Sequence, residues 1–183
     1  MTSVRSHVGR SIACAAIVFV AAGGQAAAAP RGGARITAVR VADRRIEDLL
    51  NRSLVRSATL RDLVAQLEQT ATIVYIESGE PTPDRTPGRT RFVTTGAGGW
   101  RYLRISIDER RSNLDVMSLV AHELQHAVEI AQNPEVVDDA SMVGLYQRIS
   151  SVSGRGVGGS HWFETQAAID MGRRVYLELF GMI

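Results

Sequence analysis

Residues 119–130, LVAHELQHAVEI, place His122, Glu123 and His126 in the order His-Glu-x-x-His. Residues four apart lie one above the other on an α-helix, so His122 and His126 can direct two imidazole nitrogens at one point. Imidazoles that converge in this way are typical ligands of a tetrahedral Zn²⁺. Glu123 is rotated by about 100° from His122. Its carboxylate would therefore lie beside the metal, where it can accept a proton from an activated water.

The other residues of this segment are mostly apolar, which indicates a helix buried against a core and not a solvated loop. They include Leu119, Val120, Leu124, Ala127, Val128 and Ile130. The alternative is a helix with two ordinary histidines that match a short pattern by chance. Against it, the chain has only four histidines, of which His7 lies near the start and two of the others stand at ligand spacing. The pattern favours a metal site that needs a third protein ligand, with its fourth position open to water.

Four acidic residues and a histidine later in the chain are the candidates for this third ligand. They are Glu129, Asp138, Asp139, His161 and Glu164. Glu129 lies on the motif helix itself, one turn past His126, and would have difficulty reaching a metal that its own helix already binds. We expect Glu129 to orient a ligand or to carry a surface charge.

Glu164 is the preferred third ligand. It lies in WFETQAAIDMGRRV, in the expected first turn of an amphipathic helix whose small Ala167 and Ala168 permit close packing against another helix. A carboxylate from a second packed helix would complete the site, whereas the alternative is a glutamate that stabilises its own helix dipole. His161 is the second choice as a ligand, and it could otherwise orient or protonate a bound group.

The first 28 residues have the three-part layout of a secretory signal peptide. Arg5 and Arg10 precede an apolar run at 11–22 and the small-residue tract GGQAAAAP, with cleavage expected after Ala28 or close to it. The apolar run is too short to span a bilayer comfortably. We therefore expect an exported protein, periplasmic or extracellular, with no stable membrane anchor after cleavage. The only cysteine, Cys14, lies in this leader, so the mature protein would have neither a disulfide nor a thiol nucleophile.

The charge balance gives no support to nucleic acid as a partner. The chain has 21 basic and 19 acidic residues, and removal of Arg5 and Arg10 with the leader leaves the two in balance. The basic pI of about 9.1 for the whole chain is thus no sign of a nucleic-acid or anionic membrane partner. About 150 residues remain, which suits one domain. We expect an N-terminal tail at 29–42, loose at 30–36 with a short extended piece at 37–41, and a single domain at 43–183.

The hydrophobic patterns predict an α+β fold. Helices are expected at 43–55, from Thr59 onward, at 113–132, at 137–150 and at 162–179, and strands at 71–76, 91–95 and 100–108. Thr59 and Asp62 resemble a capping box, and Ser112 or Asn113 is expected to cap the motif helix. The glycine-rich stretch 153–160 is expected to lack regular structure.

The motif HELQHAVEI, preceded by the amphipathic strand RYLRISID and followed by FETQAA, resembles the zincin superfamily of metallopeptidases, and more narrowly the gluzincins. The resemblance covers roughly residues 60–180 and includes compact, minimal gluzincins. It implies a short, mostly antiparallel sheet packed on a backing helix and on the motif helix, followed by a helical part that carries the third ligand. It also implies Zn²⁺ bound by His122, His126 and Glu164, with Glu123 as general base. An edge strand, expected at 100–108, would hold an extended peptide by main-chain pairing.

The chain also departs from the gluzincin pattern. Many gluzincins carry an aspartate four residues after the ligand glutamate, behind a zinc histidine, but this position is Ala168 here and the nearest acid is Asp170. No certain donor to the transition-state oxyanion is visible. Tyr146, His161 or an arginine could serve, although a tyrosine on an amphipathic helix is more often a core residue. The segment after His126 lacks the glycine and third histidine of a metzincin.

The leading hypothesis is an exported zinc-dependent peptidase that acts on a peptide or protein substrate. The alternative is a secreted or periplasmic zincin-like domain, weak or inactive as an enzyme, that binds zinc for structural or partner-binding reasons. Structural zinc sites are closed, four-ligand sites that often use cysteine, and no cysteine follows residue 14. The composition therefore favours the open, catalytic kind of site.

Overall fold

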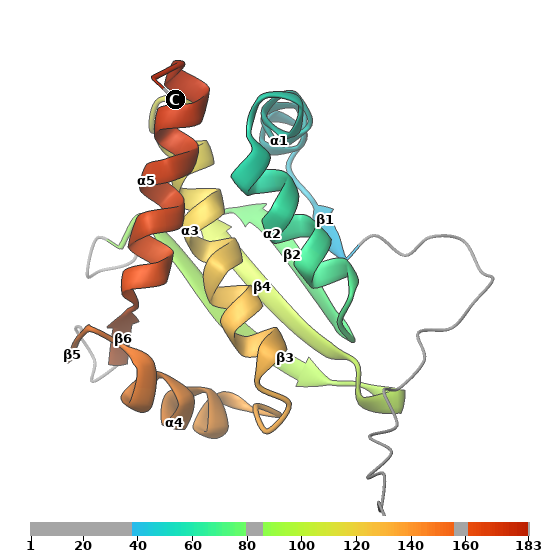
Figure 1. Cartoon of the computed structure of the whole chain (residues 1–183). Helices are drawn as coiled ribbons and strands as arrows, with labels where there is room; N and C mark the ends of the chain where they lie inside the picture. The colour runs from blue at the N-terminus through green and yellow to red at the C-terminus, as the bar shows by residue number, and fades with distance from the viewer. Residues whose placement is uncertain (1–37, 80–85, 156–160, 183) are drawn as a thin grey trace, which may run out of the picture. The chain divides into compact units, whose positions relative to one another are not determined.

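The computed structural model describes residues 38–79, 86–155 and 161–182 (Figure 1). The predicted signal peptide and most of the predicted tail at 29–42 lie outside these residues. Within the described ranges, no helix is both long and apolar enough to cross a bilayer.

The α+β class predicted from the sequence is confirmed. The helices are α1 (Arg44–Arg56), α2 (Ala58–Glu68), α3 (Asn113–Gln132), α4 (Asp139–Ile149) and α5 (Gln166–Phe180). One sheet has the order β1 (Val39–Val41), β2 (Thr72–Ser78), β4 (Arg101–Ile107) and β3 (Gly88–Thr95), and the β3–β4 turn contains the short helix η1 (Ala97–Gly99). A separate antiparallel ribbon consists of β5 (Val152–Arg155) and β6 (His161–Glu164). The first part of the stretch at 153–160 therefore forms a strand, contrary to expectation.

Two of the three strand pairs in the larger sheet are parallel, so the expectation of a mostly antiparallel sheet is wrong. β1 and β4 both run parallel to β2, and only the hairpin of β3 and β4 is antiparallel. Parallel neighbours need a long connection, which α1 and α2 supply between β1 and β2. β4 is paired on both sides and is therefore not the edge strand that was expected. The edge strands are β1 and β3.

The motif helix α3 is held between the sheet and α5. Figure 1 shows α2 and α3 lying against one face of the sheet, with α5 beside α3. In β4, Leu103, Ile105 and Ile107 are fully buried while the alternate residues face outward, so one face of the sheet forms the core. Most residues of α3 are buried as well. The two histidines of the motif thus extend from a rigid element.

Both ends of α3 are capped. The Ser112 side chain accepts a hydrogen bond from the Asp115 amide, as the sequence predicts. At the other end the buried Arg101 guanidinium donates to the carbonyls of Ile130, Ala131 and Asn133 at 2.7–2.8 Å. A cation at a helix C-terminus satisfies free carbonyls and complements the helix dipole. β4 therefore fixes the end of α3.

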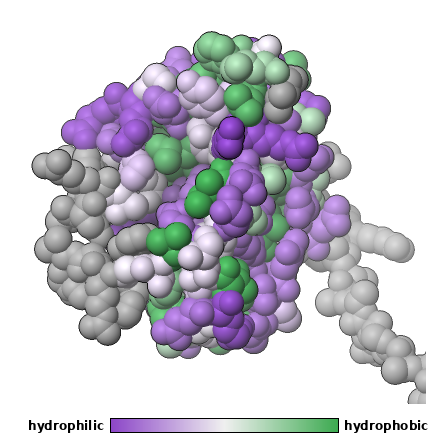
Figure 2. Space-filling view, turned by 60° about the vertical axis from the view of Figure 1, so that its left-hand side comes forward, coloured by the Kyte–Doolittle hydropathy of each residue, from purple (hydrophilic) through white to green (hydrophobic). Residues whose placement is uncertain are grey.

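The surface shown in Figure 2 is mostly hydrophilic, with a hydrophobic region at the end where α5 finishes. Phe180 and Met182 are exposed there. Glu164 precedes the opposite end of α5, so this apolar region is separate from the motif residues.

Candidate metal centre

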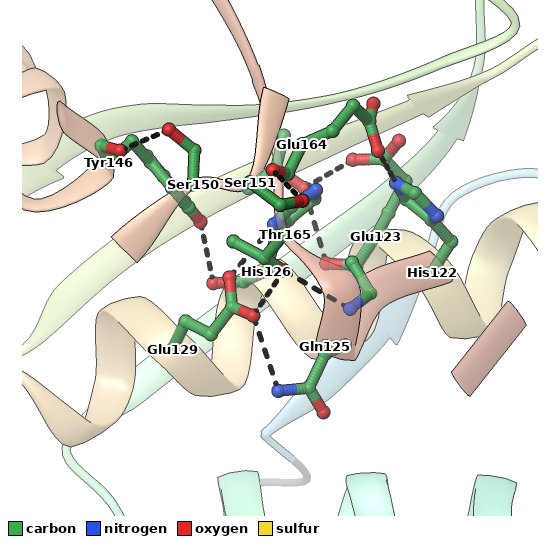
Figure 3. A network of polar contacts seen from close by, with 12 residues as sticks. His122, Glu123, Gln125, His126, Glu129, Tyr146, Ser150, Ser151, Glu164 and Thr165 are labelled. Atoms are coloured by element: carbon green, nitrogen blue, oxygen red, sulfur yellow. Dashed lines mark hydrogen bonds and ion pairs between the residues drawn. The ribbon is translucent and has the colours of Figure 1, made fainter. Parts of the chain in front are cut away.

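His122, His126 and Glu164 lie together, with one potential ligand atom from each within 4.8 Å of the others. The two histidines extend from α3 one turn apart, and their ring centroids are 4.9 Å from each other. Figure 3 shows the Glu164 and His122 side chains pointing toward one another. The three residues predicted as ligands are therefore brought together by the fold.

Glu164 is the last residue of β6, not part of the first helical turn that was expected. Thr165 is the N-cap of α5, because its hydroxyl accepts a hydrogen bond from the Ala168 amide at 3.1 Å. Pairing of Glu164 with Val152 in the β5–β6 ribbon keeps the preceding residues extended. The carboxylate is thus presented from a strand end just before the helix.

Close packing of α5 on α3 brings Glu164 to the histidines. A methyl group added at Gly172 would lie 3.0 Å from the Ser118 carbonyl oxygen and 3.3 Å from the His122 Cβ. The Ser118 hydroxyl donates to the Gly172 carbonyl at 2.9 Å. Ala168 is fully buried, as expected of a small residue at a helix contact, whereas Ala167 is exposed and does not share this role.

The residues present fit a zinc ion. Glu164 Oε2 lies 3.0 Å from His122 Nε2, at ion-pair distance, yet this buried oxygen accepts no well-formed hydrogen bond from the described residues. A buried carboxylate oxygen without a donor is costly, and a cation would remove that cost. Two imidazole nitrogens and one carboxylate oxygen are also a common protein ligand set of catalytic zinc.

The electrostatics of the pair agree with this arrangement. Burial acts to lower the pKa of His122, but the Glu164 and Glu123 carboxylates outweigh it and raise the pKa above 6.5. Burial acts to raise the pKa of Glu164, but His122 and His126 outweigh it and hold the pKa below 4.5. Both shifts reflect the attraction between the His122 ring in its charged form and the Glu164 carboxylate.

Glu123 is buried beside the ligand group on the β3 side. Its Oε2 accepts a hydrogen bond from the Thr90 hydroxyl at 2.8 Å. A Cβ added at Gly88 would lie only 2.6 Å from Glu123 Oε1, so the lack of a side chain at Gly88 makes room for the carboxylate. Burial raises the pKa of Glu123 above 4.5, although the two histidines oppose this. The sequence analysis missed Gly88 and Thr90 because it expected the strand to begin at Arg91, whereas β3 begins at Gly88.

Glu129 supports His126 from behind. Its Oε2 lies 2.9 Å from His126 Nδ1, and its Oε1 accepts a hydrogen bond from the Thr165 hydroxyl at 2.6 Å. When Nδ1 donates to the carboxylate, Nε2 is left for a metal. Glu129 was expected either to orient a ligand or to carry a surface charge. Its side chain is buried, which supports the first of these roles. A carboxylate behind a histidine ligand was looked for at position 168, where the chain has alanine. Glu129 places a carboxylate behind His126 instead.

Tyr146 packs against His126 and does not present a free hydroxyl. Its hydroxyl donates to the His126 carbonyl at 3.1 Å, its ring is edge-on to the His126 ring at 5.3 Å, and it stacks on Phe163. Burial raises the pKa of Tyr146 well above its ordinary value. This geometry favours the core role for Tyr146 over that of an oxyanion donor.

Two of the remaining candidates, Asp138 and Asp139, fall outside the ligand group. The backbone of His161 pairs with Arg155 at the start of β6, while its side chain lies outside what the structure describes. Asp138 is the N-cap of α4, and Asp139 is exposed.

A cleft of about 510 Å³ opens over this group between β3 and α4. Glu123, His126 and Glu164 line it, together with residues 88–91 of β3 and an apolar wall from α4 and β6. The members of this wall are Met142, Val143, Tyr146 and Phe163. This volume is typical of ligand-binding sites.

Comparison with protein families, with curated proteins and with solved structures found no match for this chain. The interpretation of the site therefore depends on the geometry of its own residues.

Proposed function

We propose that this protein is an exported zinc-dependent peptidase of the gluzincin type. His122, His126 and Glu164 would bind the zinc ion, and Glu123 would be the general base. The observation that carries the proposal is the convergence of the three ligand atoms within 4.8 Å, next to a cleft that Glu123, His126 and Glu164 line.

The chain's own residues supply the proton transfers. A bound zinc ion contributes Lewis-acid chemistry, since it acidifies a water and polarises a carbonyl. Glu123 accepts a proton from the attacking water and returns it to the leaving amine nitrogen as the C–N bond breaks. Burial raises the pKa of Glu123, which favours acceptance of a proton, whereas a nearby cation would act in the opposite direction. The Thr90 hydroxyl holds the Glu123 carboxylate in position.

The substrate would pair with β3. β3 has β4 on one side and, among the described residues, no strand on the other. Its Gly88–Thr90 end lies against Glu123, so a peptide added to the free edge would pass the general base. Addition of a strand to an exposed sheet edge is a common mode of peptide binding.

Metal content and hydrolysis together test the proposal. We expect the purified protein to contain zinc and to hydrolyse members of a mixed peptide pool, and Glu123→Gln to retain the zinc while losing activity by about 10²–10⁴-fold. The matched control is Glu135→Gln, because Glu135 is exposed and pairs with Arg148 on the surface. Absence of zinc, or full activity in Glu123→Gln, would contradict the proposal. Zinc without hydrolysis of any peptide would favour the alternative, a zincin-like binding domain.

A further inference from the structure

The side chains of β3 alternate between the cleft side and the open face of the sheet. Thr90 faces Glu123, whereas Arg89 and Arg91 pair in register with Ser106 and Arg104, which lie on the outward side of β4. Both arginines also line the cleft, so they stand at its rim. The edge strand therefore presents two arginines next to the position proposed for the substrate.

Among the described residues, none compensates the charge of Arg91. Arg91 is exposed, lies directly opposite Arg104, and forms no ion pair or hydrogen bond with any residue that the structure describes. The carboxylate of Glu77, 3.6 Å from Arg104, comes from β2, on the far side of β4. Like charges directly opposite on a sheet are unfavourable. An anion on the free side of β3 would offset this repulsion.

A strand added to β3 would alternate in the same way. Side chains opposite Arg89 and Arg91 would lie on the open face, and the one between them, opposite Thr90, would point into the cleft. There it would meet the apolar wall, of which Met142, Val143 and Phe163 are partly exposed. One face of the substrate would thus contact arginines and the other an apolar surface.

We propose that the substrate is an extended segment in which acidic residues alternate with large apolar ones. The acidic side chains would lie opposite Arg89 and Arg91, and the apolar side chain between them would enter the cleft. This inference rests on the proposed function, because it requires the substrate to pair with β3.

Peptide binding tests this inference without depending on turnover. Three fluorescent peptides are compared on zinc-loaded Glu123→Gln by anisotropy at low salt: one alternates Glu with Leu, one Lys with Leu, and one Glu with Ser. We expect the Glu/Leu peptide to bind about tenfold more tightly than either of the others. The preference over the Lys/Leu peptide should weaken as salt is added.

Charge reversal at Arg91 tests whether this residue causes the preference for the acidic peptide. Arg91→Glu, made in the Glu123→Gln background, should reverse the preference between the Glu/Leu and Lys/Leu peptides, and Arg91→Gln should reduce it. The control is Arg44→Glu, which makes the same charge change at an exposed position on α1. Retained helical content and melting temperature would show that the Arg91 variants are folded.

The outcomes distinguish this inference from the proposed function. Equal binding of the three peptides, no binding of any, or an unchanged preference in Arg91→Glu would overturn the inference. If wild type still hydrolyses the mixed pool with zinc and Glu123, the peptidase proposal survives that result. If zinc binding or the dependence on Glu123 fails, the peptidase proposal falls, whatever charge preference the edge strand shows.

Discussion

Glu129 connects the two segments that carry the candidate ligands. Its carboxylate contacts His126 on α3 and Thr165, the residue after Glu164. We expect Glu129→Ala to weaken zinc binding by about 10–100-fold, the usual effect of removing a group that orients a metal ligand. Glu164→Ala should weaken it much more, because it removes a ligand. Competition titration against a chromophoric chelator measures both.

An exposed acid provides the control for this comparison. Glu135→Ala removes a similar charge from the surface and should leave the zinc affinity unchanged. Equal, small effects of Glu164→Ala and Glu129→Ala would remove Glu164 from the site.

Gly88 provides a steric test of the general base. In Gly88→Ala the new methyl would lie 2.6 Å from Glu123 Oε1, so the carboxylate has to move. Since Glu123 is not a ligand, we expect zinc affinity to be retained while kcat falls by about 10–100-fold, as small displacements of catalytic groups do. Gly144→Ala is the control, because an added Cβ there meets only the end of Arg148 at 3.9 Å. Loss of kcat in both variants, or in neither, would contradict this role for Gly88.

Sequence alone predicted the ligand group, including the distant Glu164, and missed two of the long-range contacts around it. His122, Glu123 and His126 follow from residue spacing on one helix, so the five residues 122–126 were sufficient to predict this part of the site. The support of His126 by Glu129 and Thr165 joins residues 36 positions apart, and the contact of Thr90 with Glu123 joins residues 33 apart. Such contacts depend on how α3, α5 and β3 pack, which no local pattern contains.

At the scale of elements, the cap of α2 shows the same limit. The predicted capping box at Thr59 and Asp62 is wrong, because Ser57 is the N-cap and its hydroxyl accepts from the Leu60 amide. Glu178 of α5 completes the cap by accepting hydrogen bonds from the Ser57 and Thr59 hydroxyls. Glu178 lies 119 positions after Thr59, so its part in the cap cannot be inferred from the local sequence.

The Glu178 cap gives a prediction for stability against pH. Burial acts to raise the pKa of Glu178, but hydrogen bonds from Ser57 and Thr59 outweigh it and hold the pKa below its ordinary 4.5. The stabilisation is therefore present above about pH 4.5 and is lost as the pH falls through the folded-state value. We expect Glu178→Gln to lower the unfolding free energy by about 1 kcal/mol near neutral pH.

Urea denaturation at several pH values measures this effect. The difference between wild type and Glu178→Gln should narrow as the pH falls below 4.5. Glu68→Gln, at an exposed position on α2, should show no comparable change. A difference that stays constant down to the lowest pH would argue against the charged cap.

The sheet was predicted in its local part as well. The hairpin of β3 and β4 follows from two alternating segments around a glycine-rich turn. The strand order does not follow from the local sequence. β2 pairs with β4, from Thr72 opposite Arg101 to Ser78 opposite Ile107, although β3 comes between these two strands in the sequence. This pairing makes β3 one of the two edge strands and moves the proposed peptide site from β4 to β3.

At the scale of the whole molecule, the sequence after residue 14 offers no disulfide, so the core and the proposed metal must hold the fold. The core joins the sheet to α1, α2 and α3, with Val175 and Leu179 of α5 also buried in it. The proposed zinc ion would add a link between α3 and the start of α5. A metal that binds only the folded chain stabilises the whole domain.

Zinc removal should therefore lower the melting temperature of the entire domain. Zinc at 100 times its Kd contributes about 2.7 kcal/mol, which for a domain of this size raises Tm by about 5–10 °C. Calorimetry of chelator-treated and zinc-saturated protein measures the shift. His122→Ala should lose it, whereas Asp139→Ala, which removes an exposed acid of the cleft outside the ligand group, should keep it. Equal Tm values with and without zinc, or the same shift in His122→Ala, would show that these three residues do not hold the metal.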